Sequence, residues 1–462
     1  MRKLGQLDRR LFLAGSAASL ALSGRAFGQR RGGRAIIVGA GVAGLACAAD
    51  IQRAGMDVTV LEARAEIGGR ARTSRAWVDR PVELGASWVH GLDNNPVRDL
   101  AVQSGLALSA TDYDNRQIYG ESGGLLDRRA LNRLDEMETR LTRFAANAPG
   151  NRLESECRIR PRGVLDNRLF RLMRLDAFSE AKRRRGLFLL NTELEHEFGT
   201  DYENLSRCFW TEGEELSGGD AMLLGGIDRM MQHMAHGLDV RLSQTVLGID
   251  HDRDGVLVTT SSGTERADAV VVTVPLGVLR ENIIRFTPDL PDTKQQAIQD
   301  LGVGVLNKCI LRFGEQAWPN DPEMFNRLTA DRGAWAEWVN LSAYGQGLIL
   351  MGFNAGSYAR YLEQFDDEET VALAMEALRG MFGSSLPDPV ATQITRWSRD
   401  PHAYGSYSFP AENTQWDSRI RLLEPVDQRV FFAGEATSTR APGTLHGALQ
   451  SGRAAANAVV ER

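Results

Sequence analysis

The sequence predicts an α/β protein in which a parallel-sheet domain, assembled from separated segments, is interrupted by a second, α+β domain. Three observations predict this fold class. They are a strand–turn–helix–strand pattern from Arg34 to Glu62, a helical stretch from Leu125 to about Arg185, and a return to strand, glycine turn and helix over about the last 65 residues. A chain of 462 residues has room for two or three domains and can bury a large core.

The first βαβ unit follows from the residue types. Ala35–Val38 is a continuous apolar, β-branched run of the kind found in buried strands. Leu45–Ala54 has the periodicity of a helix, which Gly55 ends. Asp57–Leu61 predicts a second strand, which finishes at Glu62.

A Gly-x-Gly-x-x-Gly turn joins the first strand to the helix, with Gly39, Gly41 and Gly44 as its glycines and Ala43 before the last of them. Gly39 permits the tight turn, Gly41 lets the backbone approach a pyrophosphate, and Gly44 lets helix and strand pack closely. The phosphates would lie at the helix N-terminus, where free amides and the helix dipole favour negative charge. Glu62 can accept hydrogen bonds from ribose hydroxyls and would repel the 2′-phosphate of NADP. This context predicts a Rossmann-type dinucleotide site.

A second glycine pair favours FAD over NAD as the dinucleotide. Arg64 follows the ribose acid closely, and Gly69 and Arg70 lie in the run Gly68–Arg72. Glycines and arginines so close behind the acid imply more phosphate and ribitol contacts than NAD needs.

Four segments of the sequence resemble the flavin-containing amine oxidase family, which includes polyamine oxidases, monoamine oxidases and flavin-dependent histone demethylases. The segments are Val38–Arg72, Glu83–Gly91, Phe432–Thr437 and Gly443–Gly452. Because they lie near both ends of the chain, the resemblance spans nearly all of it, and polyamine oxidases are the most similar members. It implies the amine oxidase fold, a Rossmann-type FAD-binding domain with an inserted α+β substrate-binding domain.

The resemblance also implies a set of FAD-binding residues, with Glu435 near the ribitol and pyrophosphate and a helix that begins near Thr444 and Leu445 directing its positive end at the flavin ring. The backbone of Val246 would meet the adenine. Monoamine oxidases carry a flavin-linking cysteine at the position of Ser406, so FAD is expected to be bound non-covalently. The full set is Gly39, Gly41, Ala43, Gly44, Glu62, Arg64, Gly69, Arg70, Ser87, Trp88, Val246, Glu435, Thr444 and Leu445.

Lys308 lies in an otherwise apolar strand, Leu306–Ile310. Burying an unpaired ammonium costs several kcal/mol, so this lysine either faces solvent or has a specific partner. In the family that the sequence resembles, a lysine in this strand holds a water against the flavin and assists its reoxidation by oxygen. Lys308 is therefore the first candidate for a catalytic residue.

Tyr407 matches the aromatic wall of the family's substrate site, where it would flank the substrate amine and attract a cation through its ring. An alternative is that Tyr407 is a plain core aromatic. The second aromatic of the family's cage would fall near Leu445, which is aliphatic, so the cage is expected to be only half built.

His90 corresponds to a position at the entrance of the family's catalytic tunnel, and it could titrate near neutral pH and sense the charge of the amine. A structural histidine is nearly as good an interpretation. The acidic residues between Glu193 and Glu215 could attract a polycation, but solvated loop charges are the favoured interpretation. The same holds for Arg183–Arg185, where solvated helix faces are favoured over a basic partner site. His446 is expected to be a structural residue at a helix start.

The expected domain parts alternate along the chain. An export signal occupies 1–28, and the predicted parts of the FAD-binding domain are 34–110, 210–285 and 397–462. The substrate domain would take the helical segment 111–209 and the segment 286–396.

The N-terminus predicts export by the twin-arginine route. Arg9 and Arg10 precede the apolar run Leu11–Leu22, and small residues follow near Ala26–Gly28. The run is too short to span a bilayer, which takes about 20 apolar residues, so a periplasmic or secreted protein without a membrane anchor is expected. A frayed amphipathic helix is the alternative.

Composition excludes some other classes of protein. The formal net charge of −6 argues against a nucleic-acid partner. The four cysteines have neither metal-ligand spacing nor the density of a disulfide framework, so no metal site is predicted.

The sequence therefore predicts an FAD-dependent oxidase that passes a hydride from a polyamine or secondary amine to the flavin. The imine product is hydrolysed, and O₂ is reduced to H₂O₂. A monoamine or L-amino-acid oxidase, and a flavin-carrying binding or electron-transfer protein without oxidase turnover, remain alternatives.

Overall fold

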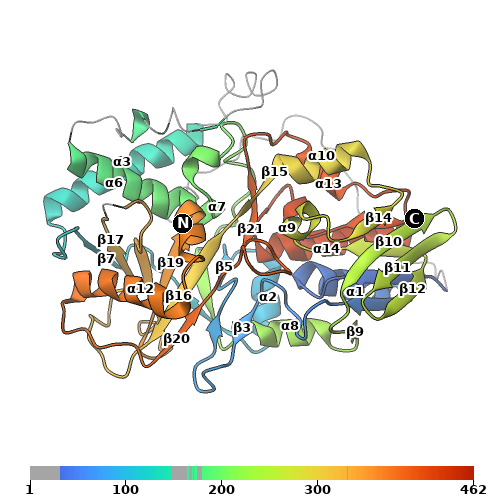
Figure 1. Ribbon diagram of the computed structural model, residues 1–462, viewed down its shortest axis with the longest axis horizontal. Coiled ribbons are helices and arrows are strands. Elements are labelled where there is room, and N and C mark those ends of the chain that lie inside the picture. Colours follow the sequence, from blue (N-terminus) through green and yellow to red (C-terminus); the bar gives the residue numbers. More distant parts are fainter. Residues whose placement is uncertain (1–31, 148–163, 166–168, 170, 174–178, 330) are drawn as a thin grey trace.

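The computed structural model describes residues 32–147, 164–165, 169, 171–173, 179–329 and 331–462. This part of the chain is a mixed α/β structure with several sheets (Figure 1). The predicted export signal at 1–28 lies outside the described residues. Within them, no helix is both long enough and apolar enough to cross a membrane.

A five-stranded sheet, parallel throughout, contains the predicted βαβ unit. Val38 at the end of its central strand lies between Val272 and Leu61 of the neighbouring strands. Because all five strands run the same way, their carboxyl ends share one edge of the sheet. The strand order is β22 (Val430–Phe432), β13 (Ala269–Val272), β1 (Arg34–Val38), β2 (Asp57–Leu61) and β9 (Asp239–Arg241).

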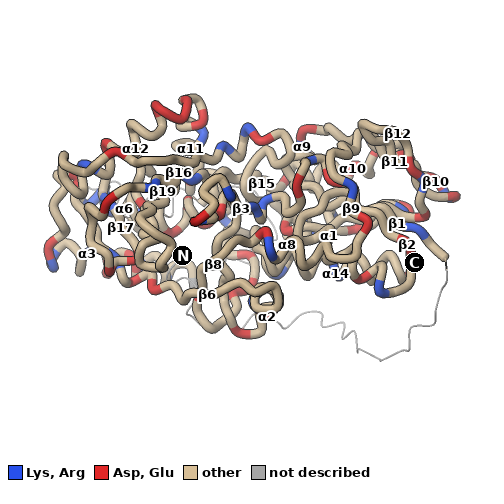
Figure 2. The backbone as a smooth tube through the Cα atoms, turned by 90° about the horizontal axis from the view of Figure 1, so that it is seen from below, with Lys and Arg blue, Asp and Glu red and all other residues tan. Residues whose placement is uncertain are grey.

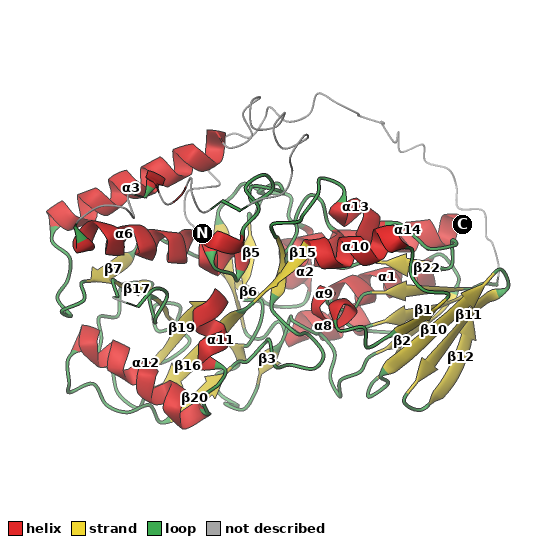
Figure 3. Ribbon diagram, turned by 45° about the horizontal axis from the view of Figure 1, so that its top comes forward, coloured by secondary structure: helices red, strands yellow, loops and turns green. Residues whose placement is uncertain are grey.

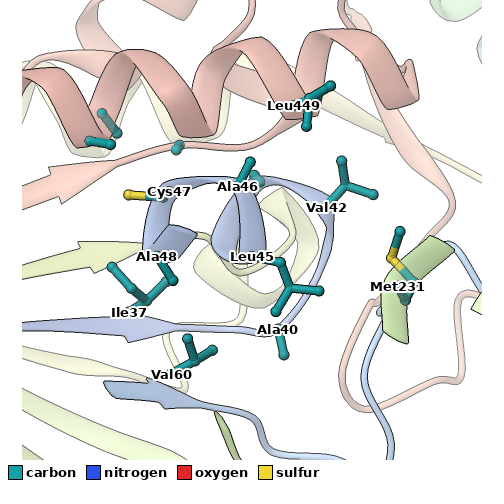
Figure 4. Packing of buried hydrophobic residues seen from close by; sticks show 14 of the residues in the cluster. Ile37, Ala40, Val42, Leu45, Ala46, Cys47, Ala48, Val60, Met231 and Leu449 are labelled. Carbon is teal, nitrogen blue, oxygen red and sulfur yellow. The ribbon is translucent and has the colours of Figure 1, made fainter. Parts of the chain in front are cut away.

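Two helices, α1 (Val42–Arg53) and α14 (Leu445–Glu461), pack together over this sheet (Figure 4). Their apolar side chains join those of β1 and β2 in one core, to which Leu45, Val60 and Leu449 contribute. A Cβ on Gly452 of α14 would lie 2.1 Å from the carbonyl oxygen of Ala43 in α1. Glycine therefore allows the two helix backbones to approach closely.

A second, larger sheet lies at the other end of the molecule, with α3 (Arg128–Asn147), α6 (Glu180–Leu190) and α12 (Asp367–Phe382) around it (Figures 1 and 3). Both faces of its central strands are buried. Phe325 and Trp338 pack into the core on one face, and Met324 and Val339 pack into a separate core on the other. The order is β20 (Ala391–Ile394), β16 (Leu306–Arg312), β19 (Ile349–Ala355), β18 (Glu337–Asn340), β17 (Met324–Arg327) and β7 (Arg116–Tyr119).

Smaller sheets lie between and beside the two large ones. The sheet β12 (Gly263–Ala267), β11 (Gly255–Thr260), β10 (Val246–Asp252), β14 (Arg285–Thr287) adjoins the parallel sheet. The others are β5 (Trp88–His90) with β8 (Asp220–Leu224) and β6 (Ala107–Ala110), β15 (Leu301–Gly304) with β21 (Tyr407–Pro410), and β3 (Thr73–Ser74) with β4 (Val82–Glu83).

Further helices connect these sheets. They are α2 (Pro96–Gln103), α7 (His196–Phe198), α8 (Asp228–Ala235), α9 (Leu276–Arg280), α10 (Asp292–Asp300), α11 (Gly356–Leu362) and α13 (Ser418–Leu423).

Two expectations about local structure are wrong. Helix α1 begins at Val42 and not at Leu45, because the turn ends at Gly41 and Gly44 is accommodated inside the first helical turn. The arginine run is not uniformly solvated: Arg183 is exposed, but Arg185, in the middle of α6, is buried and only 8% exposed.

Candidate active site

A cavity of about 2880 Å³ extends from the carboxyl edge of the parallel sheet to the six-stranded sheet. Gly39, Glu62 and Val246 line it on one side, and Lys308 and Tyr407 line it on the other. Of the residues predicted for the site, Gly44 is the one outside the lining. A Cβ there would lie 2.0 Å from the carbonyl oxygen of Gly39, so Gly44 serves the packing of helix against strand.

The glycine turn leaves room for a ligand and not for a side chain of the protein. Gly39 has φ +105°, and its amide donates to the carbonyl of Leu61 at 2.8 Å. A Cβ on Gly41 would meet its nearest protein atom, the Gly68 carbonyl oxygen, only at 3.9 Å. Glycine at position 41 is therefore not required by the protein's own packing, and it fits a phosphate group lying against the backbone.

Glu62 holds the turn as well as facing the cavity. One carboxylate oxygen accepts from the amide of Ala40 at 2.8 Å and the other from the amide of Arg64 at 2.9 Å. Each oxygen keeps a lone pair for a ribose hydroxyl. The guanidinium of Arg64 pairs with Asp400 at 2.6 and 2.7 Å, so this arginine is already neutralised.

Glu435 is the buried centre of a polar network between the C-terminal motif and the glycine cluster. It accepts from Arg70 at 2.9 Å, from the hydroxyl of Ser408 at 2.7 Å and from the amide of Gly443 at 3.0 Å. Burial alone would raise its pKa, but Arg70, Ser408 and Arg419 outweigh burial and hold the pKa below its ordinary value. Glu435 is therefore a carboxylate throughout the neutral range.

Helix α14 directs its N-terminus at the cavity. Thr444 caps it by accepting from the amide of Gly447 at 3.0 Å, and Leu445 and His446 in the first turn line the cavity. The positive end of a 17-residue helix favours negative charge there. Burial, with the charge of His90, lowers the pKa of His446 to about 4, which leaves its imidazole neutral.

These features fit FAD. The Gly39–Gly41 turn and the α1 N-terminus would hold the pyrophosphate, Glu62 the ribose, and the α14 N-terminus the flavin end. When bound, FAD supplies the electron acceptor for hydride transfer. Ser406, the residue at the position of the flavin-linking cysteine of monoamine oxidases, uses its hydroxyl within the protein. This hydroxyl donates to the carbonyl of Leu306 at 3.1 Å and accepts from the Leu306 amide at 2.8 Å.

Lys308 is buried and all three of its N–H donors are used. Its Nζ donates to the carbonyls of Glu83 at 2.9 Å and Gly85 at 2.6 Å, and to the hydroxyl of Ser87 at 2.5 Å. Burial lowers the pKa of Lys308, and the nearby Glu83 carboxylate counteracts part of that effect. The interpretation of an exposed strand lysine is thus wrong.

Tyr407 faces the cavity, and its hydroxyl donates to the carbonyl of His196 at 2.6 Å. The His196 imidazole is buried. Its Nδ1 lies 3.4 Å from Glu337, its ring centroid lies 6.3 Å from that of Phe353, and its Nε2 has no hydrogen-bond partner among the described residues. Sequence reasoning missed His196, because nothing in the sequence shows that α7 passes beside β19.

His90 and Trp88 lie on β5, and both line the cavity. The indole nitrogen of Trp88 donates to the hydroxyl of Thr111 at 3.0 Å. His90 Nδ1 lies 2.9 Å from a carboxylate oxygen of Asp220, a second residue that sequence reasoning missed. The two residues are 130 positions apart and become partners only because β5 pairs with β8.

The acidic residues between Glu193 and Glu215 were expected to be solvated loop charges, and for some of them this expectation is wrong. Glu193 and Glu195 are buried in a π-helical turn, Asn191–Glu195, which continues α6. Burial raises the pKa of Glu195 to about 7, and Glu212 pairs with Arg419 at 2.9 Å. Glu197 is exposed and lines the cavity.

Acidic side chains outnumber basic ones around the cavity. The acids in the lining are Glu62, Asp112, Asp114, Glu193, Glu197, Glu212, Glu214, Glu215, Asp220, Glu337 and Glu435, and the bases are Arg64, Arg70, Lys308, Arg419 and Arg440. Over the rest of the described chain, acidic and basic residues are interspersed (Figure 2). The carboxyl edge of the parallel sheet, whose residues fit FAD, shares this acid-rich cavity with the buried Lys308, and this arrangement fits a flavin-dependent oxidoreductase.

Comparison with known proteins gives the family. Residues 42–460 match the family described as flavin containing amine oxidoreductase, and the chain belongs to it. It is 35% identical over 441 residues to polyamine oxidase 4 of Oryza sativa subsp. japonica, covering 91% of this chain and 87% of that protein. It is 35% identical over 433 residues to polyamine oxidase 2 of Arabidopsis thaliana, covering 91% and 86%. With lysine-specific histone demethylase 1 homolog 1 of Arabidopsis thaliana it shares 33% identity over 450 residues, covering 91% of this chain and 51% of that protein.

The predicted family, cofactor and enzyme class are confirmed by these matches. The protein is an FAD-dependent enzyme that oxidises small-molecule amines with O₂.

Proposed function

We propose that this enzyme is a polyamine oxidase. The observation that carries the proposal is the cavity's charge: the acids that line it suit a substrate with several ammonium groups. The curated relatives named polyamine oxidase support the same substrate class.

The arginines of the cavity disfavour an amino-acid substrate. A substrate carboxylate would require an arginine that faces it. In the described cavity lining, each arginine already pairs with an acid: Arg64 with Asp400, Arg70 with Glu435, Arg419 with Glu212 and Arg440 with Glu214. A monoamine oxidase is disfavoured by the half-built cage, since Leu445 replaces one aromatic ring.

In this proposal the chain has three tasks. Tyr407 and the apolar residues of the cavity lining, among them Phe353, exclude water and orient the amine, which must present a neutral nitrogen for hydride transfer. Glu197 and its acidic neighbours attract the distal ammonium groups. Lys308, held against Ser87, supports the reaction with oxygen. FAD is bound non-covalently, since Ser406 cannot form a thioether.

We propose two domains, one built around each of the two large sheets. The parallel sheet belongs to a Rossmann-type FAD-binding domain formed by 34–110, 210–285 and 397–462. The six-stranded sheet and its helices belong to the substrate domain, 111–209 and 286–396.

Hydrogen peroxide release tests the substrate class. Purified enzyme is given spermidine, benzylamine and an L-amino acid, and we expect kcat/KM to be at least about tenfold higher for spermidine, a difference of ~1.4 kcal/mol. Glu197→Gln should raise KM for spermidine up to about fivefold, since a solvent-exposed ion pair contributes at most about 1 kcal/mol. The matched control is Glu368→Gln on the exposed face of α12. A preference for benzylamine or an amino acid would overturn the proposal.

We also propose that the chain is exported. Arg9 and Arg10 support this, and so does the disulfide bond of Cys208, because disulfides persist in oxidising compartments. Cell fractionation of the wild type and of the double variant Arg9→Lys, Arg10→Lys tests it. We expect periplasmic or secreted wild type and a retained variant; equal distribution would contradict export by this route.

A further inference from the structure

The carboxylate of Asp220 accepts three hydrogen bonds at the wall of the cavity. It accepts from Nδ1 of His90 at 2.9 Å, from the amide of Gly91 at 2.9 Å and from the hydroxyl of Tyr113 at 3.0 Å. His90 and Asp220 lie directly opposite each other on the paired strands β5 and β8. The side chain of Asp220 is 17% exposed and that of His90 33% exposed, so the imidazole still reaches the cavity.

This arrangement decides which imidazole nitrogen carries the proton. A carboxylate can only accept, so Nδ1 of His90 must donate to Asp220. In the neutral imidazole the lone pair is then on Nε2, which can accept a hydrogen bond. In the protonated imidazole both nitrogens donate, and the acceptor is lost.

We propose that Asp220 is a positioning residue that presents Nε2 of His90 as the hydrogen-bond acceptor for a protonated nitrogen of the substrate. This inference rests on the proposed function, because it requires a cationic amine. Binding of the cation is strong while His90 is neutral and weakens when His90 is protonated, since the acceptor disappears and a like charge replaces it.

The charged and titratable groups around His90 set the pH range of this effect. They are Asp220 on β8, Glu197 on α7, Tyr113 in the loop after β6 and His446 on α14. Burial alone would lower the pKa of His90, but the hydrogen bond and charge of Asp220, with the charge of Glu197, raise it above the ordinary 6.5. KM for a cationic amine should therefore rise as the pH falls through a value above 6.5, by about tenfold per pH unit for one proton.

Asp220→Asn separates the charge of this residue from its geometry. The amide oxygen still accepts from Nδ1, so KM at high pH should change less than about threefold. The negative charge is gone, so the inflection of KM should move to lower pH by about one to three units. Tyr113→Phe removes a donor to Asp220 without changing charge, and it should leave the inflection in place or move it to higher pH.

The experiment measures KM and kcat against pH for the holoenzyme and both variants, using spermidine. The substrate's own titration is common to all three proteins, so the difference between variants isolates His90. Imidazole ¹⁵N shifts of histidine-labelled enzyme provide a second readout, in which wild type shows a protonated Nδ1 in the neutral form. An unmoved inflection in Asp220→Asn, or a neutral form protonated on Nε2, would overturn the inference. If the wild type prefers benzylamine to spermidine, the proposed function fails by itself, and the pH comparison is read with the preferred amine.

Discussion

Replacing Arg70 by glutamine should destabilise the protein by removing the cation that neutralises a buried carboxylate. Arg70 donates to Glu435 and to the carbonyl of Ser406, both at 2.9 Å, and the Glu435 side chain is only 6% exposed. A hydrogen bond to a charged group contributes about 1.5–3 kcal/mol, and breaking a buried pair costs about 3–5 kcal/mol. Because Ser408 and Gly443 still donate to Glu435, we expect a loss of about 2–4 kcal/mol in the free energy of unfolding.

Arg72→Gln is the matched control. Arg72 pairs with Glu66, but the two side chains are 36% and 49% exposed, and surface pairs contribute about 0–1 kcal/mol. Both variants and the wild type are unfolded in denaturant at the same free FAD concentration. The FAD affinity of each protein is measured separately, so that the stabilisation by bound ligand can be subtracted.

The loss of unfolding free energy in Arg70→Gln should depend on pH in a defined direction. The folded pKa of Glu435 lies below the ordinary 4.5, so its stabilising effect is present above about pH 4.5 and is lost as the pH falls through the folded pKa. The difference between wild type and Arg70→Gln should therefore be largest near neutral pH and shrink on acidification. Equal losses for Arg70→Gln and Arg72→Gln, or a difference that grows in acid, would refute the reasoning.

Three further predictions follow from the same contacts. Gly41→Ala should weaken FAD binding at least about tenfold with little effect on folding, as measured by FAD titration. Gly44→Ala should lower the free energy of unfolding by about 1–3 kcal/mol, as measured by denaturation, because its Cβ would lie 2.0 Å from a carbonyl oxygen. Lys308→Met should slow flavin reoxidation by oxygen about 10²-fold or more while anaerobic reduction by the amine changes less, as followed by stopped-flow flavin absorbance. Burial lowers the pKa of Lys294 from 10.5 to about 7, so between these pH values the unfolded chain binds more protons than the folded protein. The difference in the free energy of unfolding between wild type and Lys294→Met should therefore rise with pH by roughly 1.4 kcal/mol per unit in that range. A difference that does not change with pH in urea unfolding would contradict this prediction.

The residue pattern predicted the parts of the fold whose signal is local. The strand Asp57–Leu61 has the predicted bounds, because its apolar run ends at a charged residue on each side. The glycine turn was predicted because its spacing requires a strand before it and a helix after it. The start of α1 was missed because a glycine inside the first turn hides the helical pattern.

Parts of the site that depend on strand pairing could not be predicted. Asp220 gains its role only because β8 pairs with β5, and His196 only because α7 packs beside β19. The burial of Glu195 depends on a π-helical turn and on Arg332, whose guanidinium lies 3.1 Å from it. None of these contacts has a signature in the spacing of residues, because each joins segments more than 100 positions apart.

The segment from Glu83 to His90 links three parts of the site through its own backbone. Its carbonyls at Glu83 and Gly85 hold the ammonium of Lys308, and a Cβ on Gly85 would lie 1.7 Å from the carbonyl oxygen of Arg70, the partner of Glu435. Its last residue, His90, faces the substrate side. Since all three donors of Lys308 are used by this segment, a water could join Lys308 only by replacing one of these acceptors. The Ser87 hydroxyl is the one that can rotate away without moving the backbone. The three hydrogen bonds of Lys308 therefore fix this segment in place, and the segment's backbone connects the cofactor side of the site to the substrate side.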